Sequence, residues 1–368
     1  MQSKHIKIFH IITSLEHGGA QLLAAKLILN ENKSYNHTVF VLLDRGPYKS
    51  ILKNKGIKVY SAKSVNFIST FIRLIKCYVE SRPDIVHTWM YHADLMGLIL
   101  TIFFKKHKLI WSLHHACPKE NKFLTRVIIS FCKFFSNSIP NHIVACSSIA
   151  SLNHINYGYS SKNMMVINNG INFENFTTHS KKNYAFDSKI VVGHIARWHP
   201  IKGHKFFIKM ASNLYKKNKN FRFVLVGTGI EWQNKELVKL IEEYDLSQVV
   251  ELLGEQQNIN QILNSLDIYI STSISESFSL TLVEAIACKV LSISSDTGVA
   301  RDALSNKLCI VKTHNSSELI SAIEYLIKLP SEDIMRIVND SYEIIRSKFD
   351  ERLMLDSYDQ LYLSLNEQ

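Results

Sequence analysis

Short, continuously apolar runs alternate with amphipathic segments along the whole chain, and the alternation starts twice. Runs at 6–12, 85–88 and 109–114 predict buried strands, because the segments between them carry apolar residues at helical spacing. The pattern restarts at 190–195 and continues to 291–294. Strands without polar alternation are typical of parallel sheets that helices cover on both faces. The sequence therefore predicts an α/β fold with two doubly wound domains.

The boundary between these domains is expected in the polar stretch 177–188. The first domain then covers 1–178 and the second covers 186–347, while a last helix at about 348–368 packs back on the first domain. The length of 368 residues also corresponds to about two domains. Doubly wound domains bind ligands at the carboxyl ends of their strands. We therefore expect the chemistry just after strands, in both halves.

Positive charge is concentrated in the first half. Residues 1–185 contain 23 Lys and Arg against 8 Asp and Glu, a net charge of +15, whereas residues 186–368 contain 20 against 24, a net charge of −4. This asymmetry predicts a negatively charged partner for the first half only.

The cysteines and the apolar runs indicate a cytoplasmic protein. None of the six cysteines shows a C-x-x-C spacing, so buried reduced thiols are expected rather than disulfides or a zinc site. The longest apolar run, at 95–104, is too short to span a bilayer. Contact with a membrane is therefore expected only at its surface.

The strongest chemical motif follows the strand expected at 267–271. Glu276 lies in a loop, Glu284 lies in the first turns of the next helix, and small residues stand between them. The N-terminus of a helix offers unpaired N–H groups that suit a phosphate, and carboxylates hydrogen-bond sugar hydroxyls. The spacing favours a nucleotide sugar, with its diphosphate on the backbone. The alternative is one glutamate serving as a helix-end charge and the other lying in solvent.

A second motif places two cations around the end of another strand. Arg197 follows the strand at 190–195, and Lys202 precedes a helix. Fixed cations at the mouth of a crevice stabilise the charge that develops on a leaving diphosphate; the alternative is an ordinary solvated loop. Gly227, in a glycine turn after the strand at 221–226, is a weak signal by itself.

In this order and spacing, the motifs resemble those of the retaining GT-B glycosyltransferases of family 4. Glu276 and Glu284 match the family's E-x7-E element, and Arg197 and Lys202 match its R-x4-K-G element. The Gly18-Gly19-Ala20-Gln21 segment matches its glycine loop after the first strand. The resemblance covers the whole chain. It implies two Rossmann-like domains that face one another across a cleft.

The chain departs from the family pattern at three positions. Asn172 stands where the family's N-G-[IV]-D segment has Asp, a change expected to affect a local turn more than the chemistry. Ser277 and Ser279 replace both glycines of the usual E-G-F-G. The loop after Glu276 is therefore expected to be stiffer.

The resemblance implies a role for each matched residue. Arg197 and Lys202 bind the donor diphosphate, Glu284 binds the ribose hydroxyls, and Glu276 contacts the donor sugar near the reacting carbon. The nucleobase lies near 254–257. Further donor contacts are expected from Gly18, Gly19, Gly227, Gly254, Gln256, Ser277, Phe278, Ser279, Leu280 and Thr281. Transfer retains the anomeric configuration and needs no metal or other cofactor, and the sequence shows no strand-end D-x-D to hold a divalent cation.

The first half is expected to bind the acceptor. The family often has a histidine where His114 ends a strand, so His114 is assigned a catalytic role in positioning the donor sugar or stabilising the transition state. The alternative is a histidine with structural hydrogen bonds only. His87, Tyr91, His92 and His115 are expected to contact acceptor hydroxyls, with a packed and hydrogen-bonded cluster as the alternative.

The segment 121–137 is the candidate membrane contact. Its apolar residues are punctuated by Lys122, Arg126 and Lys133, and a second basic patch holds Lys105, Lys106 and Lys108. Each basic residue near an anionic leaflet contributes ~1 kcal/mol, and an amphipathic helix can lie in the interface plane. The alternative is a helix that packs on the sheet with its basic residues in solvent.

These observations predict transfer of a UDP-hexose or UDP-N-acetylhexosamine sugar to a polyprenyl-diphosphate-linked glycan. The reaction would take place on the cytoplasmic face of an anionic membrane, in capsule, O-antigen or lipopolysaccharide synthesis. No nucleic acid partner is expected, because no recognisable motif accompanies the basic charge. Two alternatives remain: a GT-B nucleotide-sugar 2-epimerase, and a non-catalytic scaffold that binds lipid or nucleic acid.

Overall fold

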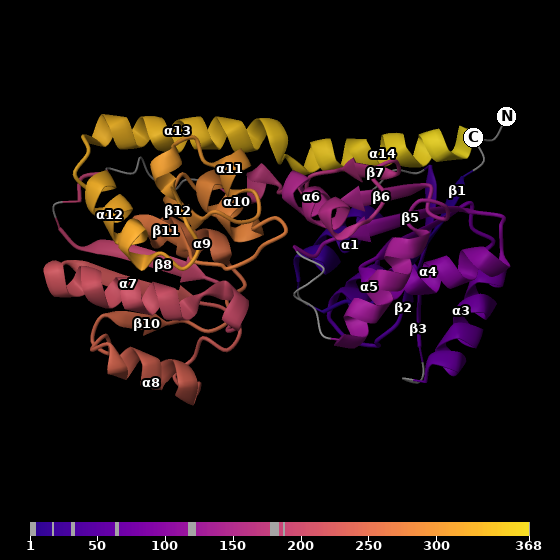
Figure 1. The fold of residues 1–368 in the computed structure, drawn as a ribbon, viewed down its shortest axis with the longest axis horizontal. Helices are drawn as coiled ribbons and strands as arrows, with labels where there is room; N and C mark the ends of the chain where they lie inside the picture. Colours follow the sequence, from indigo (N-terminus) through magenta and orange to yellow (C-terminus); the bar gives the residue numbers. More distant parts are fainter. Residues whose placement is uncertain are drawn as a thin grey trace. The chain divides into compact units, whose positions relative to one another are not determined.

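The structure, a computed structural model, describes residues 5–16, 18–30, 34–62, 66–116, 123–176, 184–186 and 188–367. The chain forms two compact units (Figure 1). Unit 1 comprises Met1–Gly170 and Arg352–Gln368, and unit 2 comprises Ile171–Glu351. Each unit contains a sheet whose strand pairs are all parallel in the described residues. The predicted α/β fold with two Rossmann-like domains is confirmed.

Unit 1 is built on a seven-stranded sheet in the order β3-β2-β1-β4-β5-β6-β7. Its strands are β1 (Ile6–Ile12), β2 (Tyr35–Val41), β3 (Lys58–Ser61), β4 (Ile85–Trp89), β5 (Lys108–Leu113), β6 (His142–Ala145) and β7 (Met164–Val166). Its described helices are α1 (Gly19–Leu29), α2 (Tyr48–Asn54), α3 (Phe67–Ser81), α4 (Tyr91–Phe103), α5 (Phe123–Phe135), α6 (Ser148–Tyr157) and α14 (Glu351–Glu367).

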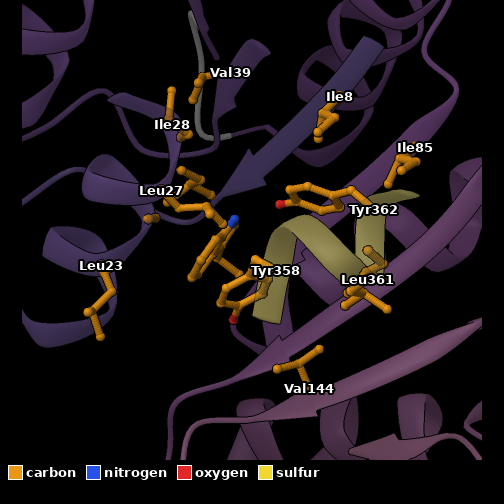
Figure 2. Close-up of a cluster of buried hydrophobic side chains, with 14 of the residues drawn as sticks. Ile8, Leu23, Leu27, Ile28, Val39, Ile85, Val144, Tyr358, Leu361 and Tyr362 are labelled. Atoms are coloured by element: carbon orange, nitrogen blue, oxygen red, sulfur yellow. The ribbon is translucent and has the colours of Figure 1, made fainter. Parts of the chain in front are cut away.

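Two apolar clusters place these helices on opposite faces of the sheet. Side chains of α1, α2 and α14 form one cluster with residues of the strands. Tyr358, Leu361 and Tyr362 of α14 lie in it together with Ile8 and Ile85 of the sheet (Figure 2). The second cluster joins α3, α4 and α5 to alternate strand residues, among them a buried tryptophan of β5. The helices α3, α4 and α5 therefore cover one face together.

Unit 2 is built on a six-stranded sheet in the order β10-β9-β8-β11-β12-β13. Its strands are β8 (Ile190–Ile195), β9 (Phe221–Val226), β10 (Val250–Leu252), β11 (Ile268–Ser271), β12 (Leu291–Ser295) and β13 (Ile310–Val311). Its described helices are α7 (His204–Lys217), α8 (Lys235–Glu243), α9 (Ile259–Ser265), α10 (Leu280–Ala287), α11 (Ala300–Ala303), α12 (Ser316–Leu326) and α13 (Ser331–Lys348), with short 3₁₀ helices η2 (Phe173–Asn175), η3 (Pro200–Lys202) and η4 (Lys307–Cys309).

The chain leaves unit 1 earlier than the expected boundary at 178. Ile171 forms a parallel bridge with Asp350, and Phe173 packs edge-on against Tyr342 of α13. These contacts hold the segment after Gly170 to unit 2. Most of the stretch 177–188 lies outside the described residues. Asn172, the departure from the family's Asp, accepts a hydrogen bond from the Glu174 N–H and so caps η2.

Candidate active site

Three neighbouring strands of unit 2 deliver the predicted donor residues to one edge of the sheet. β9, β8 and β11 are adjacent, and their carboxyl ends lead into the loops that carry Gly227, Arg197 and Glu276. Backbone hydrogen bonds join the loops: the Ala196 N–H donates to the Val226 carbonyl at 2.8 Å, and the Ile274 N–H donates to the Ile201 carbonyl at 2.8 Å. This edge is where doubly wound domains bind ligands.

Lys202 and Glu276 form an ion pair at this edge. The Lys202 ammonium donates to Glu276 Oε1 at 2.5 Å, and the Ser273 hydroxyl donates to the same oxygen at 2.7 Å. Their side chains keep 23% and 16% of their surface exposed. The cation and carboxylate predicted to meet the donor are therefore neighbours, and both stay accessible to a ligand.

Gly203 makes this pairing possible. Its backbone is left-handed, with φ 71°, and a Cβ at this position would lie 2.0 Å from the Thr272 carbonyl oxygen. The Thr272 hydroxyl in turn donates to the Lys202 and Gly203 carbonyls at 3.2 and 3.0 Å. Glycine is thus required for the two loops to touch and to bring Lys202 beside Glu276.

Gly227 lets a third loop approach. With φ 141°, it lies so close to the preceding loop that a Cβ would be 2.3 Å from the Ala196 carbonyl oxygen. Its N–H donates to the Gly254 carbonyl at 2.8 Å, which connects the turn after β9 to the turn after β10. Gln256 is exposed beside this turn and donates to the Leu253 carbonyl at 2.6 Å. The predicted nucleobase residues therefore lie next to the loop of Arg197, which is itself exposed.

The N-terminus of α10 completes the edge. Ser279 precedes the helix with a left-handed φ of 78° and gives it no side-chain cap. Phe278 is buried against Phe349 of unit 2, with ring centroids 5.1 Å apart. Burial raises the pKa of Tyr269 on β11, and the negative charges of Glu276 and Glu284 raise it further. Both predicted glutamates therefore lie near this one strand residue.

Two histidines to which the sequence assigned no role lie beside the loop of Arg197. His194 Nδ1 donates to the Ile270 carbonyl at 2.8 Å, and His204 Nε2 donates to the Ala196 carbonyl at 3.3 Å. Their rings pack edge to face at 4.8 Å. Burial lowers the pKa of His194 to about 4 and that of His204 to about 2, so both rings are neutral at pH 7. The available signal was a histidine one residue before the end of a strand and another at the start of a helix.

In unit 1, His114 lies just past the carboxyl end of β5. Its ring stacks on Trp89, with centroids 5.3 Å apart and planes 16° apart. Burial, with the nearby His115, lowers the pKa of His114 to about 3. The structure thus presents a neutral imidazole at the edge where the acceptor is expected.

The other predicted acceptor residues differ in exposure. His87 is fully buried, and its ring nitrogens lie 2.7 Å from Tyr362 Oη and 2.7 Å from Ser112 Oγ. Tyr91 is also buried, with its hydroxyl 2.7 Å from His154 Nε2. The packed alternative is therefore favoured for both.

The remaining predicted residues of unit 1 lie nearer its surface. His115 stacks on Tyr91 and is partly buried, whereas His92 is exposed. Gly18 and Gly19 are exposed at the start of α1, just after β1. These residues are available to a ligand at the same edge as His114.

The candidate membrane helix α5 buries few of its residues. Only Ile129 and Cys132 are buried on it, while Phe123, Leu124 and Phe134 are 69%, 75% and 78% exposed. The basic residues Arg126 and Lys133 lie on the same helix. Lys105 and Lys106 lie between α4 and β5, and Lys108 is the first residue of β5. Lys122 lies outside the described residues.

Two negative findings apply to the described ranges alone. Within them, no helix is long and apolar enough to cross a membrane. Nor do these residues bring three His, Cys, Asp or Glu side chains together in a group that could hold a metal ion.

Two family models match the chain, one in each unit. The family model "Glycosyl transferases group 1" matches residues 175–343, which hold the Lys202–Glu276 edge. The model "Glycosyltransferase Family 4" matches residues 31–175 of the other unit. Together they span most of the chain.

Two relatives and a solved structure match most of the chain. The chain is 26% identical to the N,N'-diacetylbacillosaminyl-diphospho-undecaprenol alpha-1,3-N-acetylgalactosaminyltransferase of Campylobacter jejuni, over 95% of this chain and 97% of that protein. It is 25% identical to the capsular polysaccharide biosynthesis glycosyltransferase CapH of Staphylococcus aureus, over 79% and 81%. The structure of Anabaena Alr3699/HepE in complex with UDP and glucose superimposes with a TM-score of 0.84 at 21% identity, over 98% of this chain and all of that one. The chain therefore belongs to the family 4 glycosyltransferases, which have the GT-B fold and use nucleotide sugars.

Proposed function

We propose that this glycosyltransferase moves a hexose or N-acetylhexosamine from its UDP conjugate to a lipid-linked oligosaccharide, with retention of the anomeric configuration and without a metal. The product would be a bacterial surface polysaccharide such as a capsule or O-antigen. The observation that carries the proposal is the Lys202–Glu276 pair, because it places a cation and a carboxylate side by side at the ligand edge of unit 2.

Charge and backbone geometry support a diphosphate donor at this edge. Arg197 and Lys202 supply two cations, and the uncapped N-terminus of α10 supplies N–H groups and a partial positive charge. Glu276 then accepts from hydroxyls of the donor sugar, and Glu284 accepts from those of the ribose. The turn that contains Gly254 and Gln256 would then contact the nucleobase. The Anabaena neighbour, whose structure holds UDP and glucose, supports the choice of a uridine donor.

The same residues suit departure of the diphosphate. Negative charge grows on the diphosphate as the bond to the sugar breaks, and cations fixed before the reaction stabilise that charge without reorganisation. Lys202 is held in place by Glu276 and by the Gly203–Thr272 contact. Two cations at this edge would perform the task that a divalent metal performs elsewhere, which supports a metal-independent reaction. His114, neutral through burial, is assigned to positioning the donor sugar.

Unit 1 suits an acceptor at a membrane surface. The helices α3, α4 and α5 cover one face of its sheet, and each exposes large apolar side chains, for example Ile68, Phe103 and Leu124. Basic residues accompany them, and amphipathic helices with this composition bind anionic interfaces. The relative from Campylobacter jejuni is named for a diphospho-undecaprenol acceptor, which supports a lipid-linked substrate. We therefore place the enzyme at the cytoplasmic face of the membrane.

Donor turnover tests the site. Glu276→Gln and Lys202→Met are each expected to lower the rate of sugar transfer on the order of 100-fold or more, the range seen when one charge-stabilising group is removed. Lys205→Met and Glu236→Gln are matched controls on α7 and α8, where both side chains are well exposed. Near-normal rates for both site variants would refute the assignment.

Three further readouts separate the alternatives. Stabilisation of the protein by UDP but not GDP, seen as a rise in melting temperature, supports the uridine donor. A product with inverted anomeric configuration would refute retention. Conversion of the donor sugar in the absence of any acceptor would instead indicate the 2-epimerase.

Vesicle sedimentation tests the membrane contact. Binding to phosphatidylcholine vesicles containing phosphatidylglycerol is expected to exceed binding to phosphatidylcholine alone. Leu124→Ser with Phe134→Ser should weaken it, because both side chains are exposed and apolar. Equal binding to the two kinds of vesicle would show that the net charge of +15 in residues 1–185 does not attract the protein to an anionic membrane.

A further inference from the structure

A basic cavity lies in unit 1, among strands and helices that are separate from the donor edge of unit 2. It has a volume of about 560 Å³ and is lined by Asp44, Lys49, Lys53, Ser61 and Arg73, among others. Ser61 ends β3, Asp44 follows β2, the two lysines lie on α2, and Arg73 lies on α3. The cavity therefore opens at the carboxyl ends of β2 and β3, at the same edge of the sheet as His114.

The charges around the cavity do not cancel. Lys49 is paired with Asp44, and this pairing lowers the pKa of Asp44. Lys53 and Arg73 form no ion pair within the ranges that the structure describes, although the charge of Lys53 also lowers the pKa of Asp44. The cavity thus carries an excess of two positive charges, which suits an anion.

Arg73 adds a specific donor. Its Nε is buried and makes no hydrogen bond to any described residue. A buried N–H group without an acceptor is unfavourable, and a ligand oxygen would satisfy it. The planar guanidinium is also the side chain best matched to phosphate.

Arg73, which lines the cavity, lies on a helix that also exposes apolar side chains. Phe67, Ile68 and Ile72 are exposed on this helix, and Ile72 directly precedes Arg73. An amphiphilic ligand with a phosphate head and a hydrocarbon tail therefore finds both of its halves matched here. The head meets Lys53 and Arg73, while the tail meets the exposed face of α3.

The spacing of the strands gives the distance that a ligand must cover between the cavity and His114. β3 and β5 are separated by four strand-to-strand steps in the order β3-β2-β1-β4-β5. Four steps of about 4.8 Å place the cavity about 19 Å from His114 along the edge. A lipid diphosphate alone does not cover this distance, whereas a short oligosaccharide attached to it does.

We propose that the cavity of Lys53 and Arg73 binds the diphosphate group of the acceptor lipid, and that the acceptor glycan extends from it along the sheet edge toward His114. This proposal rests on the proposed function for the acceptor class. Its phosphate chemistry is nevertheless testable without glycosyl transfer. The cavity then selects acceptors by their diphosphate and by the length of their glycan.

The first experiment compares two double variants that remove the same number of positive charges. Lys53→Gln with Arg73→Gln empties the cavity of its unpaired cations. Lys55→Gln with Lys76→Gln removes two exposed cations outside the cavity, one at the C-cap of α2 and one on α3. The cavity variant should raise the KM for a diphosphate-linked acceptor at least tenfold relative to the control. The KM for the UDP-sugar, and for the same glycan on an uncharged aglycone, should not change.

The second experiment needs no catalysis. Phosphatidylcholine vesicles doped with farnesyl diphosphate, or with an equal charge of phosphatidylglycerol, are sedimented with each protein in the presence of saturating UDP, which occupies the donor site. The cavity variant is expected to lose binding to the farnesyl diphosphate vesicles alone. If the cavity variant lost no more binding than the control variant on either kind of vesicle, the proposal would be overturned and general electrostatic attraction would explain the binding. A loss confined to phosphatidylglycerol would overturn it in favour of a lipid headgroup site.

Discussion

Asp94 is a buried carboxyl whose ionisation should make unit 1 less stable as pH rises. It is fully buried in the first turn of α4; the Thr88 hydroxyl donates to its Oδ1 at 2.5 Å, and its Oδ2 has no partner among the described residues. Burial raises the pKa of Asp94 from 3.8 to about 7, and the bond from Thr88 only partly opposes this. The folded protein therefore keeps a proton between pH 4 and 7 that the unfolded chain has released.

The sign and the size of the effect follow from this difference. Because the native state binds more protons than the unfolded state in this window, the free energy of unfolding falls as pH rises. From pH 5 to the folded pKa of about 7, the loss is about 2–3 kcal/mol, at 1.36 kcal/mol per unit. Asp94→Asn keeps the shape and the acceptor for Thr88 but does not titrate. The variant should therefore gain about 2–3 kcal/mol relative to the wild type between pH 5 and pH 8.

Urea unfolding of the wild type and of Asp94→Asn at pH 5 and pH 8 measures this change. Taking the difference between the two proteins removes the pH dependence of all other groups. Asp356→Asn, at an exposed position on α14, controls for the loss of a carboxylate. If the stability difference between Asp94→Asn and the wild type were the same at both pH values, the reasoning from burial would be refuted.

Two backbone predictions concern the donor edge. Gly203→Ala should lower the free energy of unfolding of unit 2 by about 2–4 kcal/mol, because it adds left-handed strain and a clash with the Thr272 carbonyl. Urea unfolding measures this loss. Gly56→Ala is the control: its φ is 81° and the space around it is open, so it shows the cost of the strain without a clash. Ser279→Gly should instead stabilise unit 2 by about 1 kcal/mol, because it removes a left-handed serine and a buried hydroxyl without a partner in the described residues; an unchanged melting temperature would contradict this.

The sequence predicted the elements whose signals are local. The strands at 6–12, 190–195 and 221–226 have the predicted bounds, because a continuous apolar run is enough to identify them. The helix α6 (Ser148–Tyr157) was missed. Its polar residues obscure the helical period, although Ser147 caps it and Gly158 ends it in the left-handed conformation.

The candidate site was predicted as a set of residues but not as a set of contacts. The spacing of Glu276 and Glu284 identified the loop and helix of the donor edge, but nothing in the sequence showed that Lys202 would pair with Glu276, because this contact joins residues 74 positions apart. His87 was assigned to the acceptor since it stands at a strand end. Its burial depends on α14, whose Tyr362 reaches it across 275 residues. Such long-range packing is set by the fold as a whole.

Net charge and local charge give different information about the two halves. Residues 186–368 carry a net charge of −4, yet the edge that holds Arg197 and Lys202 also has the N-terminus of a helix, so the proposed diphosphate would find positive groups there. The ion pair with Glu276 restricts Lys202, which would reduce the entropic cost of binding the proposed donor. In the basic half, the unpaired cations Lys53 and Arg73 lie in a cavity beside exposed apolar side chains. An amphiphilic anion therefore has a defined place there, which an excess of surface charge alone would not provide.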